Sequence, residues 1–174
     1  MRYAIIGLLA ISLVSCAALG SRTKVYNDTK IKNIKTIGLV TKRFDQPRNP
    51  YHKIIKESFT RTLIEGLEKE HLFKVIVLDT MENENLNINS YATDNPIDAL
   101  LIAEWKLANP HNMVTDSKVK LSLLDKESKE ILLISSHGTK FGNSYWLTPS
   151  LPRTLLDATE GALKTMGKNF KTRQ

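Results

Sequence analysis

The apolar and polar positions of residues 34–78 predict a strand, a helix and a second strand. Residues 34–40 are dense in β-branched and aliphatic side chains, which is typical of a strand. A charged loop follows over residues 41–50. Its end, Asn49-Pro50, favours the start of a helix, because a capping side chain precedes a residue whose φ is already fixed.

Apolar side chains recur on one face of the helix that this start predicts. They are Ile55, Phe59, Leu63 and Leu67, flanked by Ile54 and Ile64. The helix is expected to end near His71, since residues 73–78 are apolar and β-branched again. Strand, helix and strand in this order predict a βαβ unit with a right-handed crossover.

Residues 79–96 are polar and rich in asparagine, and they are expected to form a surface excursion. Three further strands are predicted after it. Residues 99–107 are strongly apolar, residues 118–123 alternate between polar and apolar as in a strand with one wet face, and residues 131–136 return after a polar turn. Together they predict an antiparallel meander.

A last helix is predicted after the break at Thr148-Pro149-Ser150. Its apolar stripe consists of Leu151, Leu155, Ala158, Ala162, Met166 and Phe170. The complete order predicts an α+β fold, a two-layer sandwich with one mixed sheet of about five strands and helices packed on one face.

The first residues have the layout of a secretory signal. Arg2 supplies a positive end and residues 4–14 are apolar, about half of the roughly 20 residues that a transmembrane helix needs. The sequence Leu13-Val14-Ser15-Cys16 ends this run and resembles the bacterial lipobox. The resemblance implies cleavage between Ser15 and Cys16, diacylglycerol on the Cys16 sulfur, and acylation of the new amino group, for example with palmitate.

The alternative to lipidation is an ordinary signal peptide followed by a free thiol. Cys16 is the only cysteine of the chain, so it has no internal partner for a disulfide, and lipidation accounts for it. Ala17 and Ala18 follow, and by similarity to sorted lipoproteins the absence of aspartate there favours the outer membrane. The domain is expected to face the periplasm.

Three segments are therefore expected. Residues 1–15 form the signal peptide, residues 16–33 a lipidated flexible tether, and residues 34–174 a single domain. The net charge of +7 falls to +6 when Arg2 is removed with the signal. This charge suits anionic lipid headgroups or acidic cell-wall polymers, and equally a solvated surface. Export argues against a nucleic-acid partner.

No residue set indicates catalysis, a metal site or a cofactor, so the protein is not expected to be an enzyme. The histidines His52, His71, His111 and His137 are spread along the chain without metal-ligand spacing. Ser135-Ser136-His137 lacks the glycine pattern of a nucleophile elbow. Gly138 and Gly142 do not form a phosphate loop and are interpreted as a strand end and a turn.

Two segments are candidates for contact with a partner, because exposed aromatics beside arginine often anchor interfaces. The first holds Arg43, Phe44 and Tyr51 after the first strand. The second is a loop over residues 141–147 with Tyr145 and Trp146. The alternative for Trp146 is that it caps the core beside the last helix.

The order of elements is similar to a small periplasmic domain shared by three families: the curli secretion lipoprotein, the penicillin-binding-protein activator lipoprotein and the amino-terminal domain of the Tol translocation protein. The resemblance covers roughly residues 34–170. It lies in Ile37-Gly38-Leu39-Val40 with the helix and strand that follow, and in residues 98–105, 119–125 and 128–132. Lys129 stands where those families often have glycine.

The resemblance and the anchor together predict a non-enzymatic lipoprotein that docks other proteins in an envelope assembly, such as secretion, cell-wall synthesis or outer-membrane biogenesis. The alternative is a lipoprotein that binds a lipid or another envelope ligand. That alternative requires an apolar cavity between sheet and helices, whereas docking requires an exposed patch.

Overall fold

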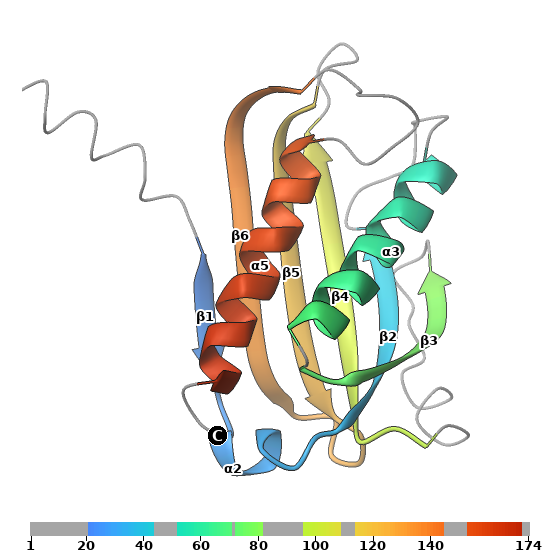
Figure 1. The fold of residues 1–174 in the computed structure, drawn as a ribbon, viewed down its shortest axis with the longest axis vertical. Coiled ribbons are helices and arrows are strands. Elements are labelled where there is room, and N and C mark those ends of the chain that lie inside the picture. The colour runs from blue at the N-terminus through green and yellow to red at the C-terminus, as the bar shows by residue number, and fades with distance from the viewer. Residues whose placement is uncertain are drawn as a thin grey trace, which may run out of the picture.

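The computed structural model describes residues 21–43, 52–70, 72–81, 96–108, 114–144 and 153–171. Its centre is one six-stranded sheet in the order β1-β6-β5-β4-β2-β3. The strands are β1 (Arg22–Val25), β2 (Thr36–Arg43), β3 (Lys74–Met81), β4 (Ala99–Ala108), β5 (Val114–Asp125) and β6 (Ile131–Ser144). The helices are α2 (Asp28–Ile31), α3 (His52–Lys69) and α5 (Arg153–Lys171). Figure 1 shows α3 and α5 side by side across the sheet.

The predicted topology is confirmed. Strand β2 pairs with β3 and with β4 in parallel, and α3 makes the crossover from β2 to β3. Strands β4, β5 and β6 form the antiparallel meander. The sheet is therefore mixed, and the fold is the predicted α+β sandwich with six strands.

Strand β1 and helix α2 correct the predicted tether of residues 16–33. Arg22 pairs with Ser136 and Val25 with Leu133, so the chain enters the sheet twelve residues before Ile34. Helix α2 begins after Asn27, whose side chain accepts a hydrogen bond from the Lys30 amide. Strand β1 has four residues, two of them charged, so its sequence lacks the hydrophobic pattern that would have predicted a strand. Charged side chains are common in strands at the edge of a sheet.

Strand β6 is longer than predicted. Residues 131–136 were expected to form it, and a loop was expected over residues 141–147, but β6 continues to Ser144. Gly138 lies inside the strand opposite Lys118. In the sequence, Gly138 and Gly142 favoured a strand end and a turn. In the structure, pairing with β5 keeps the β6 backbone extended as far as Ser144.

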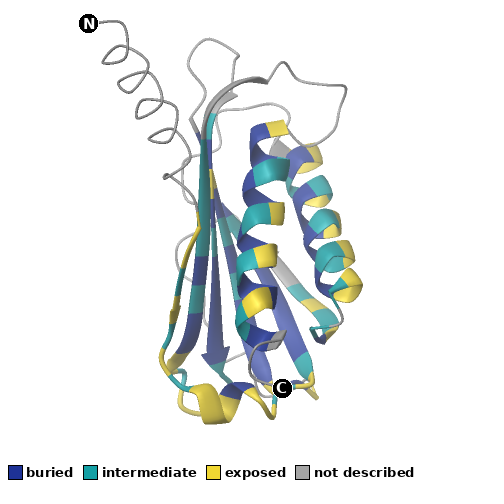
Figure 2. Cartoon of the chain, turned by 60° about the vertical axis from the view of Figure 1, so that its left-hand side comes forward, coloured by how far each residue is buried: buried dark blue, intermediate teal, exposed yellow. Residues whose placement is uncertain are grey.

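The core fills the space between the sheet and the two long helices. The predicted faces of both helices are buried in it, including Phe59 and Leu63 of α3 and Met166 of α5. Aromatic contacts tie the layers together: Phe59 lies 5.8 Å from Trp105 of β4, and Phe73 meets Phe170 edge to face at 4.8 Å, both between ring centroids. In Figure 2 the buried sides of the helices turn toward the sheet, and their exposed sides turn away.

Asp98 joins the beginnings of two parallel strands. Its carboxylate accepts hydrogen bonds from the backbone amides of Lys35 at 2.9 Å and Thr36 at 2.8 Å. These bonds, led by the one from Thr36, hold the pKa of Asp98 below its usual value. Because Asp98 directly precedes β4 and Thr36 opens β2, the carboxylate sets the register at the start of the parallel pair.

We expect Asp98→Ala to lower the free energy of unfolding by about 1 kcal/mol, since two backbone donors lose a charged acceptor. A lowered folded-state pKa gives stability that is present above the unfolded-state pKa and lost as the pH falls through the folded-state pKa. Urea unfolding of the wild type should therefore show this loss below about pH 4. In the variant the loss should be smaller, and an unchanged acid dependence would contradict the assignment.

Candidate functional site

The face of the sheet opposite α3 and α5 carries the strongest chemical signal of the described residues. Strand side chains alternate between faces. On β4 and β5, Trp105 and Val119 pack into the core with the helices, so their neighbours Lys106 and Lys118 project from the opposite face. None of the helices that the structure describes covers this surface, and we call it the helix-free face.

One part of the helix-free face is apolar. Val40, Ile97, Leu100 and Leu124 form a buried cluster there, with Ile76, Leu78 and Ile102 partly buried against it. Gly38 belongs to the same patch, because a Cβ on it would come within 2.4 Å of Leu78 and 2.8 Å of Ile97. Ser122, which was predicted on a wet face, is only 6% exposed, and its hydroxyl has no hydrogen-bond partner among the described residues.

The other part of the helix-free face is basic. Lys106 of β4 and Lys118 of β5 lie directly opposite each other, and both are exposed. Like charges in directly opposed cross-strand positions destabilise a sheet. On the other side of Lys118, its pairing partner in β6 is Gly138, which has no side chain to supply a negative charge. The pair is thus a local concentration of positive charge that the described part of the chain leaves without an ion pair.

Charges near this pair only partly balance it. Lys120 forms an ion pair with Glu104 at 2.8 Å, and Lys42 lies opposite Glu104 on the other side. Alternation also places Arg22, Lys24 and Asp116 on the helix-free face. In strands β1, β2, β4 and β5, the described side chains on this face include six basic residues and two carboxylates: Arg22, Lys24, Lys42, Lys106, Lys118 and Lys120 against Glu104 and Asp116.

The first described residues are fixed to the sheet at the edge of this face. The Ser21 hydroxyl lies 2.7 Å from Nδ1 of His137, and the Thr23 hydroxyl donates to Ser135 Oγ at 3.3 Å. The Ser135 hydroxyl in turn donates to the carbonyl oxygen of Ala162 in α5 at 2.8 Å. Strand β1 is therefore connected through β6 to the last helix.

His137 stands at the centre of this attachment. Burial lowers its pKa below the usual value, and the charge of Asp157 partly opposes that shift. The ring packs beneath Gly161 of α5 so closely that a Cβ there would lie 2.5 Å from it. The glycine therefore creates the space that the imidazole occupies. No sequence pattern indicates this contact, because 24 positions separate the two residues.

Of the predicted partner-contact residues, the structure describes Arg43. The residue is 9% exposed, and its guanidinium lies over the Trp105 ring at 5.2 Å from the centroid. The two residues are also opposite each other in the β2–β4 register. Phe44, Tyr51, Tyr145 and Trp146 lie outside the described residues, as do Ser15 and Cys16. Partner contact at these positions stays a prediction.

The described part of the chain also bears on catalytic and metal chemistry. Within it, no three His, Cys, Asp or Glu side chains come together to hold a metal ion. Ser135 and His137 lie on the helix side of β6, where they hold Ala162 and Ser21. Ser136 alternates to the other face, so the Ser135-Ser136-His137 sequence does not form a single cluster. Among the described helices, none combines the length and the apolar character that a membrane span requires.

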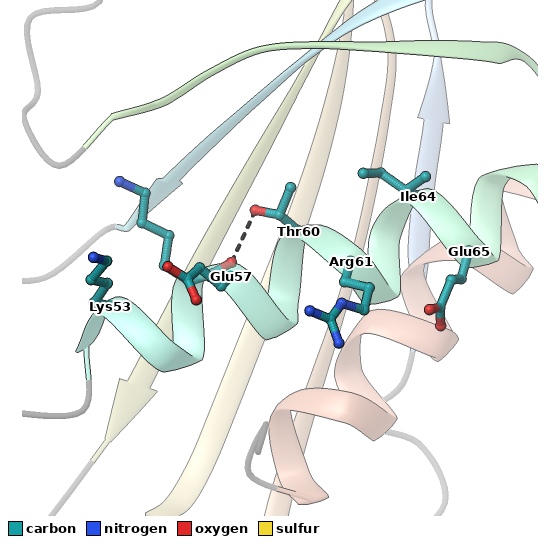
Figure 3. A pocket seen from close by; sticks show the side chains of 7 residues that line it. Lys53, Glu57, Thr60, Arg61, Ile64 and Glu65 are labelled. Atoms are coloured by element: carbon teal, nitrogen blue, oxygen red, sulfur yellow. Dashed lines mark hydrogen bonds between the residues drawn. The ribbon is translucent and has the colours of Figure 1, made fainter. Parts of the chain in front are cut away.

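Three of the surface grooves of this protein are lined by described residues. The described lining of the first, about 560 Å³, lies entirely on α3, and Figure 3 shows Lys53, Glu57, Arg61 and Glu65 along it. The second, about 520 Å³, runs between α3 and α5, and the third, about 450 Å³, lies beside Asp98 and Asp125. All three have charged linings, and none lies between the sheet and the helices.

We expect Gly161→Ala to destabilise the domain by up to about 2 kcal/mol. Alanine favours a helix over glycine by about 1 kcal/mol, but here its methyl group meets the His137 ring at a cost of about 1–3 kcal/mol. Gly167→Ala in the same helix is the matched control. Its Cβ would approach only the end of the flexible Glu70 side chain, at 3.3 Å, so it should be neutral or stabilising. Equal melting temperatures for the two variants would refute the close packing of His137.

Comparison with known proteins places the fold. No family model matches the chain, and no curated protein matches it. Among solved structures, the PelC dodecamer from Paraburkholderia phytofirmans is similar with a TM-score of 0.54 at 10% identity, over 86% of this chain and 95% of that one. The lipoprotein GNA1162 from Neisseria meningitidis has a TM-score of 0.43 at 14% identity, over 64% of this chain and 88% of that one. The chain therefore shares the overall fold of PelC, and the finer resemblance to the three periplasmic families stays a prediction.

Proposed function

We propose that this protein is a non-enzymatic lipoprotein, held on the outer membrane by lipid on Cys16, that docks proteins in an envelope assembly. The observation that carries the proposal is the position of β1. Only residues 17–20 separate Cys16 from Ser21, which is already fixed to His137. At about 3.4 Å per residue, the five steps from Cys16 to Ser21 span at most about 17 Å. The domain then stands directly on the membrane.

Docking, and not ligand storage, is supported by the packing of the domain. The space between sheet and helices is filled by side chains such as Leu39, Leu63 and Trp105, each at most 1% exposed. The three grooves described above include charged side chains in their linings and lie outside the space between sheet and helices. The alternative, a lipoprotein that carries a lipid or another envelope ligand, needs an apolar cavity that these residues do not line.

Copies of the same chain are one kind of partner that fits the proposal. PelC from Paraburkholderia phytofirmans, which has this fold, is a dodecamer in its solved structure. In the present chain, β1 and β3 are the end strands of the sheet that the structure describes, and end strands carry backbone groups available for pairing. The partner is identified by the crosslinking experiment below.

The anchor is tested by labelling cells with a fatty-acid analogue. We expect the wild type to be labelled and Cys16→Ala to remain unlabelled, because lipidation requires the sulfur atom. Cys16→Ala/Ala18→Cys is the control, since it keeps one thiol but moves it out of the Leu13-Val14-Ser15-Cys16 pattern. This variant should also remain unlabelled. Equal labelling of the wild type and Cys16→Ala would exclude the anchor.

Docking is tested by photo-crosslinking in cells from positions 44 and 146. We expect both positions to capture the same envelope protein or a second copy of the chain, identified by mass spectrometry. Position 127 serves as the control, because Glu127 is exposed in the turn between β5 and β6. Absence of any protein adduct from positions 44 and 146, with the protein correctly lipidated, would count decisively against docking there.

A further inference from the structure

The lysine pair of the helix-free face lies close to the point where the anchor meets the sheet. Arg22 pairs with Ser136, which pairs with Lys120, so two strand spacings separate Arg22 from Lys120. Lys118 precedes Lys120 by two residues in β5, and Lys106 of β4 is paired with Lys118. With spacings of about 4.8 Å between strands and 3.3 Å between residues, Lys118 and Lys106 lie about 12 Å and 16 Å from Arg22.

The distances from Arg22 to the two lysines are similar to the longest span of the segment between Cys16 and Ser21. The segment from Cys16 to Ser21 spans at most about 17 Å, so a lipid on Cys16 keeps the edge of the sheet within that distance of the bilayer. A domain held so closely must turn one of its surfaces toward the membrane. The helix-free face adjoins β1, whereas α3 and α5 lie on the opposite side of the sheet (Figures 1 and 2).

The chemistry of this face fits an anionic bilayer. Arg22, Lys24, Lys106 and Lys118 are all exposed on it, and they come from three strands, so they address a broad surface and not a slot. Tyr26 continues the face at the end of β1: it is 51% exposed, and the Lys24 ammonium lies 4.6 Å from the centre of its ring. Tyrosine beside lysine is typical of residues at the membrane–water interface.

The opposed lysines also require an explanation that the fold does not provide. Lys106 and Lys118 repel each other, and glutamine at either position would preserve the strands without that cost. Phosphate groups of lipids lying between the two ammonium groups would convert the repulsion into attraction. Lysines near an anionic bilayer surface gain favourable energy of this kind.

We propose that the basic part of the helix-free face is the membrane-contacting surface of the domain and that Lys106 and Lys118 bind the headgroups of anionic lipids. This inference rests on the proposed anchor at Cys16. It assigns an orientation in which the sheet lies against the bilayer, and α3 and α5 face away from it. Docking partners then approach from the side of the two helices or from the edges of the sheet.

The test uses the full lipoprotein, purified from membranes and reconstituted into vesicles of phosphatidylcholine alone or mixed with phosphatidylglycerol. A water-soluble amine-acylating reagent labels the lysines, and mass spectrometry reads each site. We expect Lys106 and Lys118 to react roughly fivefold more slowly on the mixed vesicles than on phosphatidylcholine, and salt at about 1 M to remove the difference. Lys53 of α3 and Lys164 of α5 should react equally on both.

Matched variants separate the charge of the pair from a general effect. In Lys106→Gln/Lys118→Gln, the protection of Lys24 on the mixed vesicles should fall, because the face has lost its main lipid contacts. In Lys53→Gln/Lys164→Gln, which removes the same charge from the helices, Lys24 should stay protected. Circular dichroism confirms that both variants are folded.

Each other outcome overturns the proposal in a defined way. Equal labelling of Lys106 and Lys118 on both kinds of vesicle excludes lipid contact at this face. Protection by inorganic phosphate in detergent micelles, as strong as that on vesicles, indicates a simple anion site. Protection in native membranes but not in vesicles assigns the face to another polyanion. The intact mass distinguishes the two proposals: a chain without lipid on Cys16 refutes the anchor itself, whereas a lipidated chain with equal labelling refutes only the orientation.

Discussion

Both long helices of this protein pack on the same face of its sheet, and that one-sided arrangement constrains the chemistry of every strand. Residues that alternate toward the helices are almost completely buried, as Leu101, Ala103 and Trp105 of β4 show. Residues that alternate the other way have no helix above them among the described elements. In one region they remain apolar around Leu100 and Leu124, and in another they become lysines.

The periodic part of this arrangement is readable from sequence. A period near 3.6 identified the buried faces of α3 and α5, and the alternation of Lys118, Lys120 and Ser122 with apolar residues identified the two faces of β5. These patterns are local, so a single segment is enough to reveal them. They specify which side chains point together, and they also led to the correct order of the strands in the βαβ unit and the meander.

Pairing between segments that are distant in the sequence leaves no local pattern from which it could be predicted. Strand β1 has only four residues, two of them charged, and it exists because its backbone pairs with β6 more than a hundred positions later. The continuation of β6 through Gly138 likewise depends on β5. The opposed lysines are visible only once the register of β4 and β5 is known, since no local pattern relates positions 106 and 118. The sequence predicted a solvent-exposed face of β5, but it did not predict that Ser122 on that face is buried.

The pairing of β1 with β6 changes what the proposed lipid anchor implies. A tether of residues 16–33 would have let the domain rotate freely and stand far from the bilayer. With Ser21 and Thr23 hydrogen-bonded to β6, only residues 17–20 separate Cys16 from the sheet, and the proposed attachment point becomes one particular edge of that sheet. A short link to a rigid edge restricts orientation as well as distance. In the proposed arrangement, charge selects among the remaining orientations, because β1, β2, β4 and β5 place six described basic side chains and two acidic ones on the face beside that edge. The proposed anchor, the edge strand and the lysine pair thus favour the same orientation, which would leave the surface of the two helices for other proteins.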